Sequence, residues 1–478
     1  MIRAKDRREI SCNEEPVVNK KRERIIFVIY LAAFLLFAST LAVFQPVSDT
    51  PPLYANPPDE HARILIPRYI CEYGRIPTGF EPEVRIPAYG FSYGLYNVFP
   101  YIVQGYVMWF FHLFTDSFRV LLYSARFVNV FFGLFMAVVV YKLGKRMFED
   151  ERFRWLFCFA VTFLPQNLFL HTYINTDSCC MLSTAMMVYA LVCCYKDGIN
   201  GKNSLWMSAG IILCALSYYN AYGYILSCIL LFVAYFITRK DGKLRYDWKA
   251  MLRWGILISC IVLIGIGWWF IRAYLVLDGD FLGLQTRVKM AETYAIEAVN
   301  PLYTKSYQEK GYSLLEMFRE NDTIRGAFYS FVGLYGSMAI MASRPMYWCY
   351  EIFFGLGIAG CFLRIFSKRK NEVIKGKELF FHLNMLFCMA MPLYLMIYYA
   401  YTMDYQHQGR YVLPALVPLM YYTVKGLEQL AGLRLKGALL PRKLVTVFVV
   451  IAAVGIFLTS AYMIYVRALP ICLQTGVV

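Results

Sequence analysis

Charge is scarce in this sequence. Only 17% of its 478 residues are charged, whereas 59% are hydrophobic; soluble domains average about 25% charged and about 45–50% apolar residues. The mean hydropathy of +0.47 applies to the whole chain, so a soluble enzyme with a single membrane anchor is excluded. We infer that the chain buries most of its surface in lipid. Its 18% aromatic content suits two membrane–water boundaries, where aromatic side chains gather.

Metal-binding and disulfide motifs are also lacking. Most of the 14 Cys residues lie inside apolar segments, and no spaced Cys-x-x-Cys pair occurs. We therefore expect neither a disulfide framework nor a zinc site. The net charge of +16 does not indicate a nucleic-acid partner, because Lys and Arg are split among short loops. No internal repeat is evident, which weighs against transporter folds built from repeated halves.

Long apolar runs predict an all-α polytopic membrane protein with about 11 transmembrane helices, in a range of about 10–13. The first run follows a basic cluster and has no small-residue cleavage site after it. This pattern favours a retained signal-anchor over a cleaved signal peptide. The predicted runs are 25–44, 119–141, 155–173, 178–195, 204–219, 221–237, 252–276, 345–365, 379–401, 411–424 and 444–466.

The positions of Lys and Arg predict the orientation. Six short stretches contain 31 of the 48 basic residues, and we place them in the cytoplasm. They are 1–24, 142–154, 196–203, 239–251, 364–378 and 425–443. With 11 spans, the N-terminus is then inside and the C-terminus outside.

This assignment divides the chain into a cytoplasmic basic N-terminus, 1–24, and a single transmembrane domain, 25–478. Two long outer loops result, 45–118 and 277–344, and loops of this length are usually functional. Phe99–Phe114 and the run from Phe328 to Met341 do not fit as full crossings. We expect both to form interfacial or re-entrant helices on the outer face.

The first candidate site follows the first span. Pro57 and Pro58 stiffen the chain before Asp59, Glu60 and His61, and an apolar helical pattern comes next. Two carboxylates at the edge of the bilayer are partly desolvated, which raises a carboxyl pKa and helps the group act as a base. The alternative is that Asp59 caps the helix and Glu60 is solvated.

A second candidate is the segment with Asn175 and Asp177, between two apolar helices. Asn-x-Asp is ordinary turn and N-cap chemistry, but an acidic residue at the mouth of membrane helices needs a partner. A third contains Trp269 and Arg272 at the outer end of a span. Trp268 and Trp269 are most simply interfacial belt residues, at least one of the two, whereas Arg272 there is disfavoured unless it meets an anion.

The fourth candidate contains Gln408 and Arg410, just before another span. Arg410 either snorkels to the outer surface or forms a fork to a phosphate, whose oxygens match the planar guanidinium. The predicted topology brings all four segments to one membrane face. This convergence is the main argument from the residues for an external active site.

The pieces just described resemble those of the GT-C superfamily of polytopic glycosyltransferases, the class of the protein O-mannosyltransferases and aminoarabinose transferases. The resemblance is to a bacterial branch with Pro-x-Asp-Glu in the first outer loop. Here the motif reads Pro57-Pro58-Asp59-Glu60. Later pieces follow in the expected order over about 350 residues: Ala125–Asn129, Asn175–Asp177, Trp269–Arg272, Phe331–Gly336 and Gln408–Pro414.

The resemblance implies a glycosyltransferase that uses a sugar carried on polyprenyl phosphate and inverts the configuration in a single displacement. Asp59 would be the general base with Glu60 beside it, and the other candidates would bind substrate: His61, Asn175, Asp177, Trp269, Arg272, Gln408 and Arg410. The acceptor is a glycan, a lipid or a protein. A divalent cation as cofactor is left open.

This chain departs from the branch at two points. His61 follows Glu60 directly, and the turn that often carries a Lys reads Tyr218–Tyr222 here. Arg272 or Arg410 must then contact the lipid phosphate. The resemblance implies a multi-pass protein of a bacterial cell membrane with its active site outside. The alternatives are a transporter or flippase of lipid-linked saccharides, and a scaffold subunit of a cell-envelope complex.

Overall fold

The computed structural model describes residues 20–47, 55–96, 98–240, 243–368, 376–435 and 438–474. Most of these residues are helical, which confirms the predicted all-α class. Strands in the described ranges form only three two-stranded antiparallel hairpins. The N-terminal stretch predicted to be cytoplasmic lies outside the described residues up to position 19.

Seven helices in the described ranges are long and apolar enough to cross a membrane, by length and composition. They coincide with seven of the predicted runs. The seven are α1 (Lys20–Phe44), α5 (Phe118–Met147), α8 (Asp177–Asp197), α11 (Trp248–Val276), α15 (Arg344–Lys368), α16 (Gly376–Thr402) and α18 (Arg442–Ala461), which continues through a π-helical segment (Tyr462–Ala468) into α19 (Leu469–Gln474).

Shorter helices occupy the other four predicted runs, so the full number of crossings stays a prediction. The run 155–173 is divided because Pro165 cannot continue a helix and begins a new one. These shorter elements are α6 (Glu151–Thr162), α7 (Pro165–Leu170), α9 (Gly201–Ala215), the 3₁₀ turn Tyr219–Ala221, α10 (Tyr222–Tyr235), the 3₁₀ segment Gly409–Ala415 and α17 (Leu416–Ala431).

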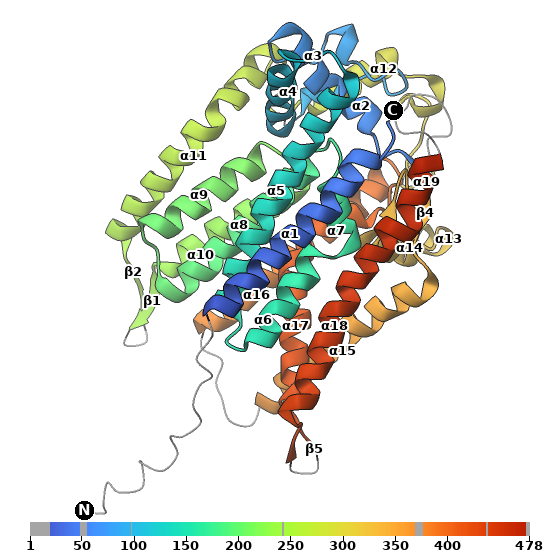
Figure 1. Ribbon diagram of the computed structural model, residues 1–478. Helices are drawn as coiled ribbons and strands as arrows, with labels where there is room; N and C mark the ends of the chain where they lie inside the picture. The colour runs from blue at the N-terminus through green and yellow to red at the C-terminus, as the bar shows by residue number, and fades with distance from the viewer. Residues whose placement is uncertain are drawn as a thin grey trace, which may run out of the picture.

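The helices form one elongated bundle, shown in Figure 1. Helix α8 is its centre, with 89% of its apolar window buried, whereas α11 lies at one edge with only 6% buried. Helices α15 and α17 approach closely because both carry glycine: a Cβ on Gly360 would lie 2.0 Å from the carbonyl oxygen of Gly426. Small residues at such crossings are typical of helix packing in membranes.

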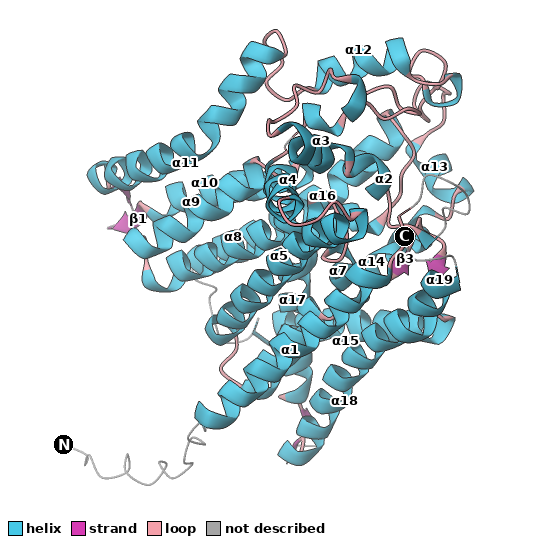
Figure 2. Ribbon diagram, turned by 45° about the horizontal axis from the view of Figure 1, so that its top comes forward, coloured by secondary structure: helices cyan, strands magenta, loops and turns pink. Residues whose placement is uncertain are grey.

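One end of the bundle carries the elements of the two long predicted loops, and we call it the site end. It is the upper end in Figure 1, and Figure 2 turns it toward the viewer. The first loop contributes α2 (Glu60–Arg63), α3 (Leu65–Tyr73), two 3₁₀ turns (Pro82–Val84 and Tyr93–Leu95) and α4 (Phe99–His112). The second contributes α12 (Leu284–Tyr294), the 3₁₀ turn Glu297–Val299, α13 (Leu314–Glu320), α14 (Thr323–Val332), β3 (Leu334–Tyr335) and β4 (Ile340–Met341).

The structure bears out one of the two helices predicted in these loops and corrects the other. The predicted run Phe99–Phe114 contains α4, which is helical from Phe99 to His112 as expected. The run from Phe328 to Met341 is helical only as far as Val332, and strands β3 and β4 then pair as a hairpin. The helix stops because Gly333 adopts an extended conformation, and Gly336 supplies a positive φ of 61° for the turn.

The opposite end of the bundle gathers the basic stretches, and we call it the basic end. Glu23 pairs with Lys145 and Arg154, both at 3.2 Å, and thereby joins the N-terminal end of α1 to the α5–α6 turn. Further contacts bring in three more stretches: Arg146 with Asp197, Arg152 with the carbonyl of Arg442, and Lys377 over the ring of Tyr235. Hairpins β1 (Ile237–Lys240) with β2 (Lys243–Tyr246) and β5 (Arg434–Leu435) with β6 (Ala438–Leu439) lie there too.

Candidate functional site

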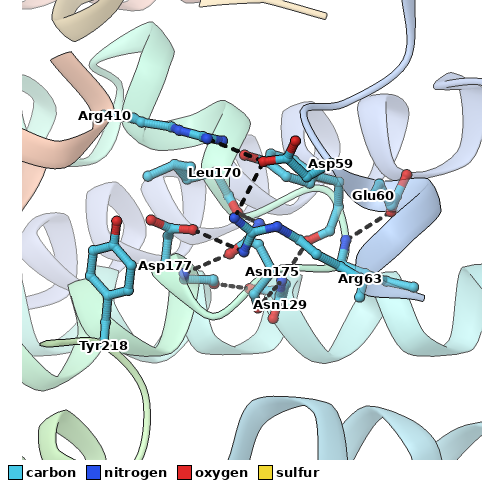
Figure 3. A network of polar contacts seen from close by, with 12 residues as sticks. Asp59, Glu60, Arg63, Asn129, Leu170, Asn175, Asp177, Tyr218 and Arg410 are labelled. Carbon is cyan, nitrogen blue, oxygen red and sulfur yellow. Dashed lines mark hydrogen bonds and ion pairs between the residues drawn. The ribbon is translucent and has the colours of Figure 1, made fainter. Parts of the chain in front are cut away.

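Four chain segments meet in an ionic network at the site end (Figure 3). Asp59 precedes α2, Arg63 ends α2, Asp177 begins α8, and Arg410 lies in the 3₁₀ segment before α17. Asp59 Oδ2 lies 3.2 Å from Arg410 Nη2 and 3.7 Å from Arg63 Nη2. Arg63 Nη1 lies 3.5 Å from Asp177 Oδ2, so Arg63 bridges the two carboxylates. Sequence positions up to 351 residues apart thus form one site.

Asp59 differs in two ways from a simple helix cap. Its backbone is left-handed, with φ of 58°, and its side chain makes no capping hydrogen bond within the described residues. Such backbone positions outside glycine cluster at functional sites. The carboxylate points to the two arginines instead and keeps 28% of its side-chain surface exposed. The capping alternative is therefore wrong for the side chain of Asp59.

The pKa of Asp59 also departs from the expectation of a raised value. Burial raises the pKa of this carboxyl, but the positive charges of Arg410 and Arg63 outweigh burial and hold the pKa below its ordinary value of 3.8. An opposite charge within a few ångströms favours the ionised form. Asp59 is therefore a carboxylate over the whole neutral range, able to accept a proton but not to donate one.

Glu60 occupies a different environment from its neighbour. It is fully buried, and its carboxylate accepts hydrogen bonds from Arg126 Nε at 2.9 Å, Arg126 Nη2 at 2.5 Å and the amide of Ile174 at 2.8 Å. Arg126 also donates to the carbonyls of Ala42 and Gln45. This buried fork fastens α2 to α5 and to the end of α1. Glu60 therefore holds the helices together and is not solvated.

Asn175 also serves the scaffold. Its amide donates to the carbonyls of Leu170 and Tyr173, and its oxygen accepts from the amide of Ser178 in the first turn of α8. These bonds shape the turn that presents Asp177, which is itself 4% exposed. The predicted need of Asp177 for a partner is met by Arg63.

Arg410 opens onto a small pocket. Only 6% of the residue is exposed, so the snorkelling alternative is wrong. Within the described residues, Arg410 Nε and Nη1 and Gln408 Oε1 are buried without hydrogen-bond partners. Unpaired buried donors are costly and uncommon, so they call for a ligand. The pocket is lined by Pro58, Gln166, Ser330, Leu334, Met338, Gln408 and Arg410.

Three predicted residues lie elsewhere or contribute less. Arg272 covers the ring of Trp269 at 5.2 Å and donates to the carbonyl of Pro77 at 2.6 Å. Trp269 is 3% exposed and belongs to a buried cluster, so it is not a belt residue, whereas Trp268 is 42% exposed. His61 is half-buried, and its charge lowers the pKa of Asp59 only as a minor cause, after Arg410 and Arg63.

Sequence reasoning missed the aromatic side chains that line this site, Tyr93, Tyr101 and Tyr218, which we call the aromatic wall. Arg63 lies 5.2 Å above the ring of Tyr93 and donates to the hydroxyl of Tyr101. Tyr218 lies beside Asp177 in Figure 3. The signal that could have found the wall is the alternation of aromatic and small residues in Tyr89-Gly90-Phe91-Ser92-Tyr93.

No group of three or more His, Cys, Asp or Glu residues that could hold a metal occurs within the described ranges. The two carboxylates that face one another in the site, Asp59 and Asp177, both contact Arg63. The guanidinium of Arg63 thus links these two carboxylates.

Comparisons with known proteins support the fold. Residues 81–420 match a family model described as "Predicted membrane protein (DUF2142)", a range that begins after Asp59 and includes Asp177 and Arg410. No curated protein matches the sequence.

Solved structures of the Archaeoglobus fulgidus oligosaccharyltransferase are similar to this chain. The apo form superposes with a TM-score of 0.53 at 14% identity, and AglB in complex with an inhibitory peptide and a dolichol-phosphate with 0.50 at 14% identity. Each alignment covers 93% of this chain and 56% of the archaeal one, so this chain spans about half the length of those structures. The likeness shows the GT-C fold.

Proposed function

The chain belongs to the DUF2142 family of predicted membrane proteins, and we propose that it is a glycosyltransferase acting on a polyprenyl-phosphate-linked sugar. The observation that carries this proposal is the pairing of a partly exposed carboxylate, Asp59, with a buried arginine, Arg410, two of whose nitrogen atoms have no hydrogen-bond partner among the described residues. A base and an anion site side by side are what sugar transfer from a phosphate requires. The archaeal oligosaccharyltransferases of similar fold make this reaction class the natural one to test.

In the proposed reaction, Asp59 is the general base. Both arginines contact its Oδ2, and we assign Oδ1 to the acceptor hydroxyl. Asp59 takes the hydroxyl proton while the acceptor oxygen attacks the anomeric carbon of the donor sugar. The bond from that carbon to the phosphate oxygen breaks, the electron pair leaves on the phosphate, and the anomeric configuration inverts.

Arg410 receives the leaving phosphate in this proposal. Its unpartnered Nε and Nη1 form a fork that matches two phosphate oxygens. Such a contact grows stronger as negative charge builds up on the departing oxygen, which is the condition for stabilising a transition state. Arg63 and Asp177 position Asp59, because Arg63 is shared between the two carboxylates.

The site end faces the outside in this proposal, and the basic end faces the cytoplasm. The basic stretches gather at the end of the bundle opposite to Asp59, and cytoplasmic loops are enriched in Lys and Arg. The N-terminal residues 1–24 would be cytoplasmic and 25–478 would form a single domain in a bacterial cell membrane. The acceptor approaches from the outer side.

The test is transfer by the purified full chain in proteoliposomes. Labelled polyprenyl-phosphate sugars are incorporated in the membrane, and a mixture of glycan, lipid and peptide acceptors is added outside. We expect label to move to one acceptor class and free polyprenyl phosphate to accumulate. Movement of intact donor between leaflets without transfer would support the flippase alternative instead. Assays with EDTA and with added Mg²⁺ test whether Arg63 takes the place of a divalent cation.

A further inference from the structure

Another arginine of the site end has no carboxylate partner among the described residues. Arg287 on α12 donates to the hydroxyl of Tyr399 at 3.3 Å and lies over the rings of Phe91 at 4.8 Å and Tyr96 at 5.7 Å. Within the described ranges these contacts are all with aromatic side chains. We call Arg287, Phe91, Tyr96 and Tyr399 the arginine–aromatic cluster.

The ionic network around Asp59 does not supply a counter-charge for Arg287. Arg126 pairs with Glu60, Arg410 pairs with Asp59, and Arg63 pairs with both Asp59 and Asp177. The three arginines and three carboxylates balance. Arg287 therefore adds one positive charge that these carboxylates do not offset, at an end where the positive-inside rule disfavours cations. A charge kept there is suited to an anionic ligand.

An aromatic path joins this cluster to Asp59. The ring of Phe91 lies 5.9 Å from that of Tyr93, on which the guanidinium of Arg63 rests, and Arg63 contacts Asp59. Phe91 also stacks on Tyr89, with ring centroids 5.9 Å apart and an angle of 26° between the planes. Tyr89 keeps 36% of its surface exposed.

Tyr89 also lies within electrostatic reach of the base. Burial first, and then the negative charge of Asp59, raise the pKa of the Tyr89 hydroxyl, while Arg410 lowers it. The exposed ring of Tyr89 thus contacts Phe91 of the arginine–aromatic cluster and lies within the field of Asp59. A ligand that lies along the rings of Phe91 and Tyr93 would reach Arg63, which contacts Asp59.

We propose that the arginine–aromatic cluster and Tyr89 bind the acceptor, and that this acceptor is a saccharide with an acidic group. The guanidinium of Arg287 would hold the acidic group, because its planar donors match a carboxylate. Aromatic rings with polar hydroxyls offer an apolar face to a sugar ring and a hydrogen bond to its edge. This inference rests on the proposed function, in which the buried fork of Arg410 takes the donor phosphate.

The test measures binding without the donor. Cellobiouronic acid and cellobiose, which differ by one carboxylate, are titrated against the full chain in nanodiscs by saturation-transfer NMR. We expect the acid to bind on the order of tenfold more tightly or better, from a hydrogen bond between charged groups. Arg287→Gln should abolish the preference, and Arg287→Lys should keep part of it because the charge remains. Equal or absent binding of the two sugars overturns the proposal.

Lys289→Gln is the matched control, because Lys289 lies on the same helix, is exposed and carries the same charge. It should keep the full preference. If Arg287→Gln does not fold, Tyr399→Phe removes only the hydroxyl that holds the guanidinium and should weaken the preference alone. A preference that remains in Arg287→Gln, or one that is undiminished in Tyr399→Phe, counts against the subsite.

The outcome is separable from that of the proposed function. Asp59→Asn should keep the acidic preference, because Asp59 does not contact Arg287. The protein could prefer the acidic to the neutral sugar through Arg287 and yet show no transfer activity. This result would refute the proposed function but not the binding subsite. Transfer to neutral and acidic saccharides at equal KM would refute the subsite alone. Loss of polyprenyl-phosphate binding in Arg287→Gln, with the saccharide preference unchanged, would also refute it by assigning Arg287 to the donor.

Discussion

Replacing Asp59 by Asn separates chemistry from structure at this site. Asn keeps the size of the side chain, tolerates a left-handed backbone as Asp does, and retains an oxygen that accepts a hydrogen bond from Arg410. It cannot take a proton from an acceptor hydroxyl. The variant should therefore fold, insert and bind donor while transfer fails.

The expected loss of transfer is about 10²–10⁴-fold in kcat, the usual contribution of a general base. The stability cost is smaller. Asp59 keeps 28% of its side chain exposed, and a charged hydrogen bond is worth about 1.5–3 kcal/mol, so the loss should stay below that of breaking a fully buried pair. A small fall in the melting temperature is expected with a large fall in rate.

Asp322→Asn is the matched control. Asp322 also has a left-handed backbone, with φ of 47°, precedes α14 without a capping bond in the described residues, and pairs with Arg325 at 3.1 Å. Its side chain is 61% exposed, and it is outside the network of Asp59. Initial rates in proteoliposomes, with donor binding measured separately, compare the two variants. Asp59→Asn with more than about a tenth of the wild-type kcat, or equal losses in both variants, would refute the assignment of Asp59 as base.

Four more predictions test the site. Arg410→Lys keeps the charge but loses the planar fork, so the apparent affinity for donor should fall by roughly tenfold or more, and an unchanged affinity in donor titrations would count against phosphate binding. Glu60→Gln leaves its buried arginine partner without a counter-charge, and melting in nanodiscs should show a loss of about 3–5 kcal/mol. The acid limb of kcat/KM should lie below the ordinary aspartate pKa of 3.8, because the pKa of Asp59 is lowered and its ionised form is lost only as the pH falls through that lowered pKa. A cysteine at position 310 should react with an impermeant reagent from outside and one at position 202 should not; the reverse would remove the outward orientation.

The spans were predictable because membrane helices obey one strong rule. Lipid offers no hydrogen-bond partner, so apolar length alone indicates a helix, and the run 252–276 needed no tertiary information to be recognised as α11. Apolar length is a weaker guide to structure where a segment is surrounded by protein and not by lipid. Helices such as α6 and α7 are buried inside the bundle and are shorter than a full crossing, and the hairpin that follows Val332 is allowed because Leu334, Tyr335 and Ile340 are buried among protein side chains.

The sequence could not show that Asp59 and Glu60 have different roles, Asp59 in the ionic network and Glu60 in a buried ion pair. Adjacent residues at the start of a helix point in different directions, and their environments depend on partners far along the chain. Glu60 meets Arg126, 66 residues away, while Asp59 meets Arg410, 351 residues away. The residues around positions 59 and 60 do not indicate which distant residues these two side chains contact. The spacing of four between Asp59 and Arg63 was the one local sign of the network, since residues i and i+4 are neighbours on a helix.

The network also couples donor binding to the strength of the base. Arg410 and Arg63 hold the pKa of Asp59 down, which makes Asp59 a weak proton acceptor. A phosphate bound to Nε and Nη1 of Arg410 brings negative charge close to Asp59 and offsets part of the field of Arg410. A nearby like charge raises a carboxyl pKa, so Asp59 becomes more basic when the donor is in place. Because kcat reports the complex and kcat/KM the free protein, the acid limb of kcat should lie at the higher pH.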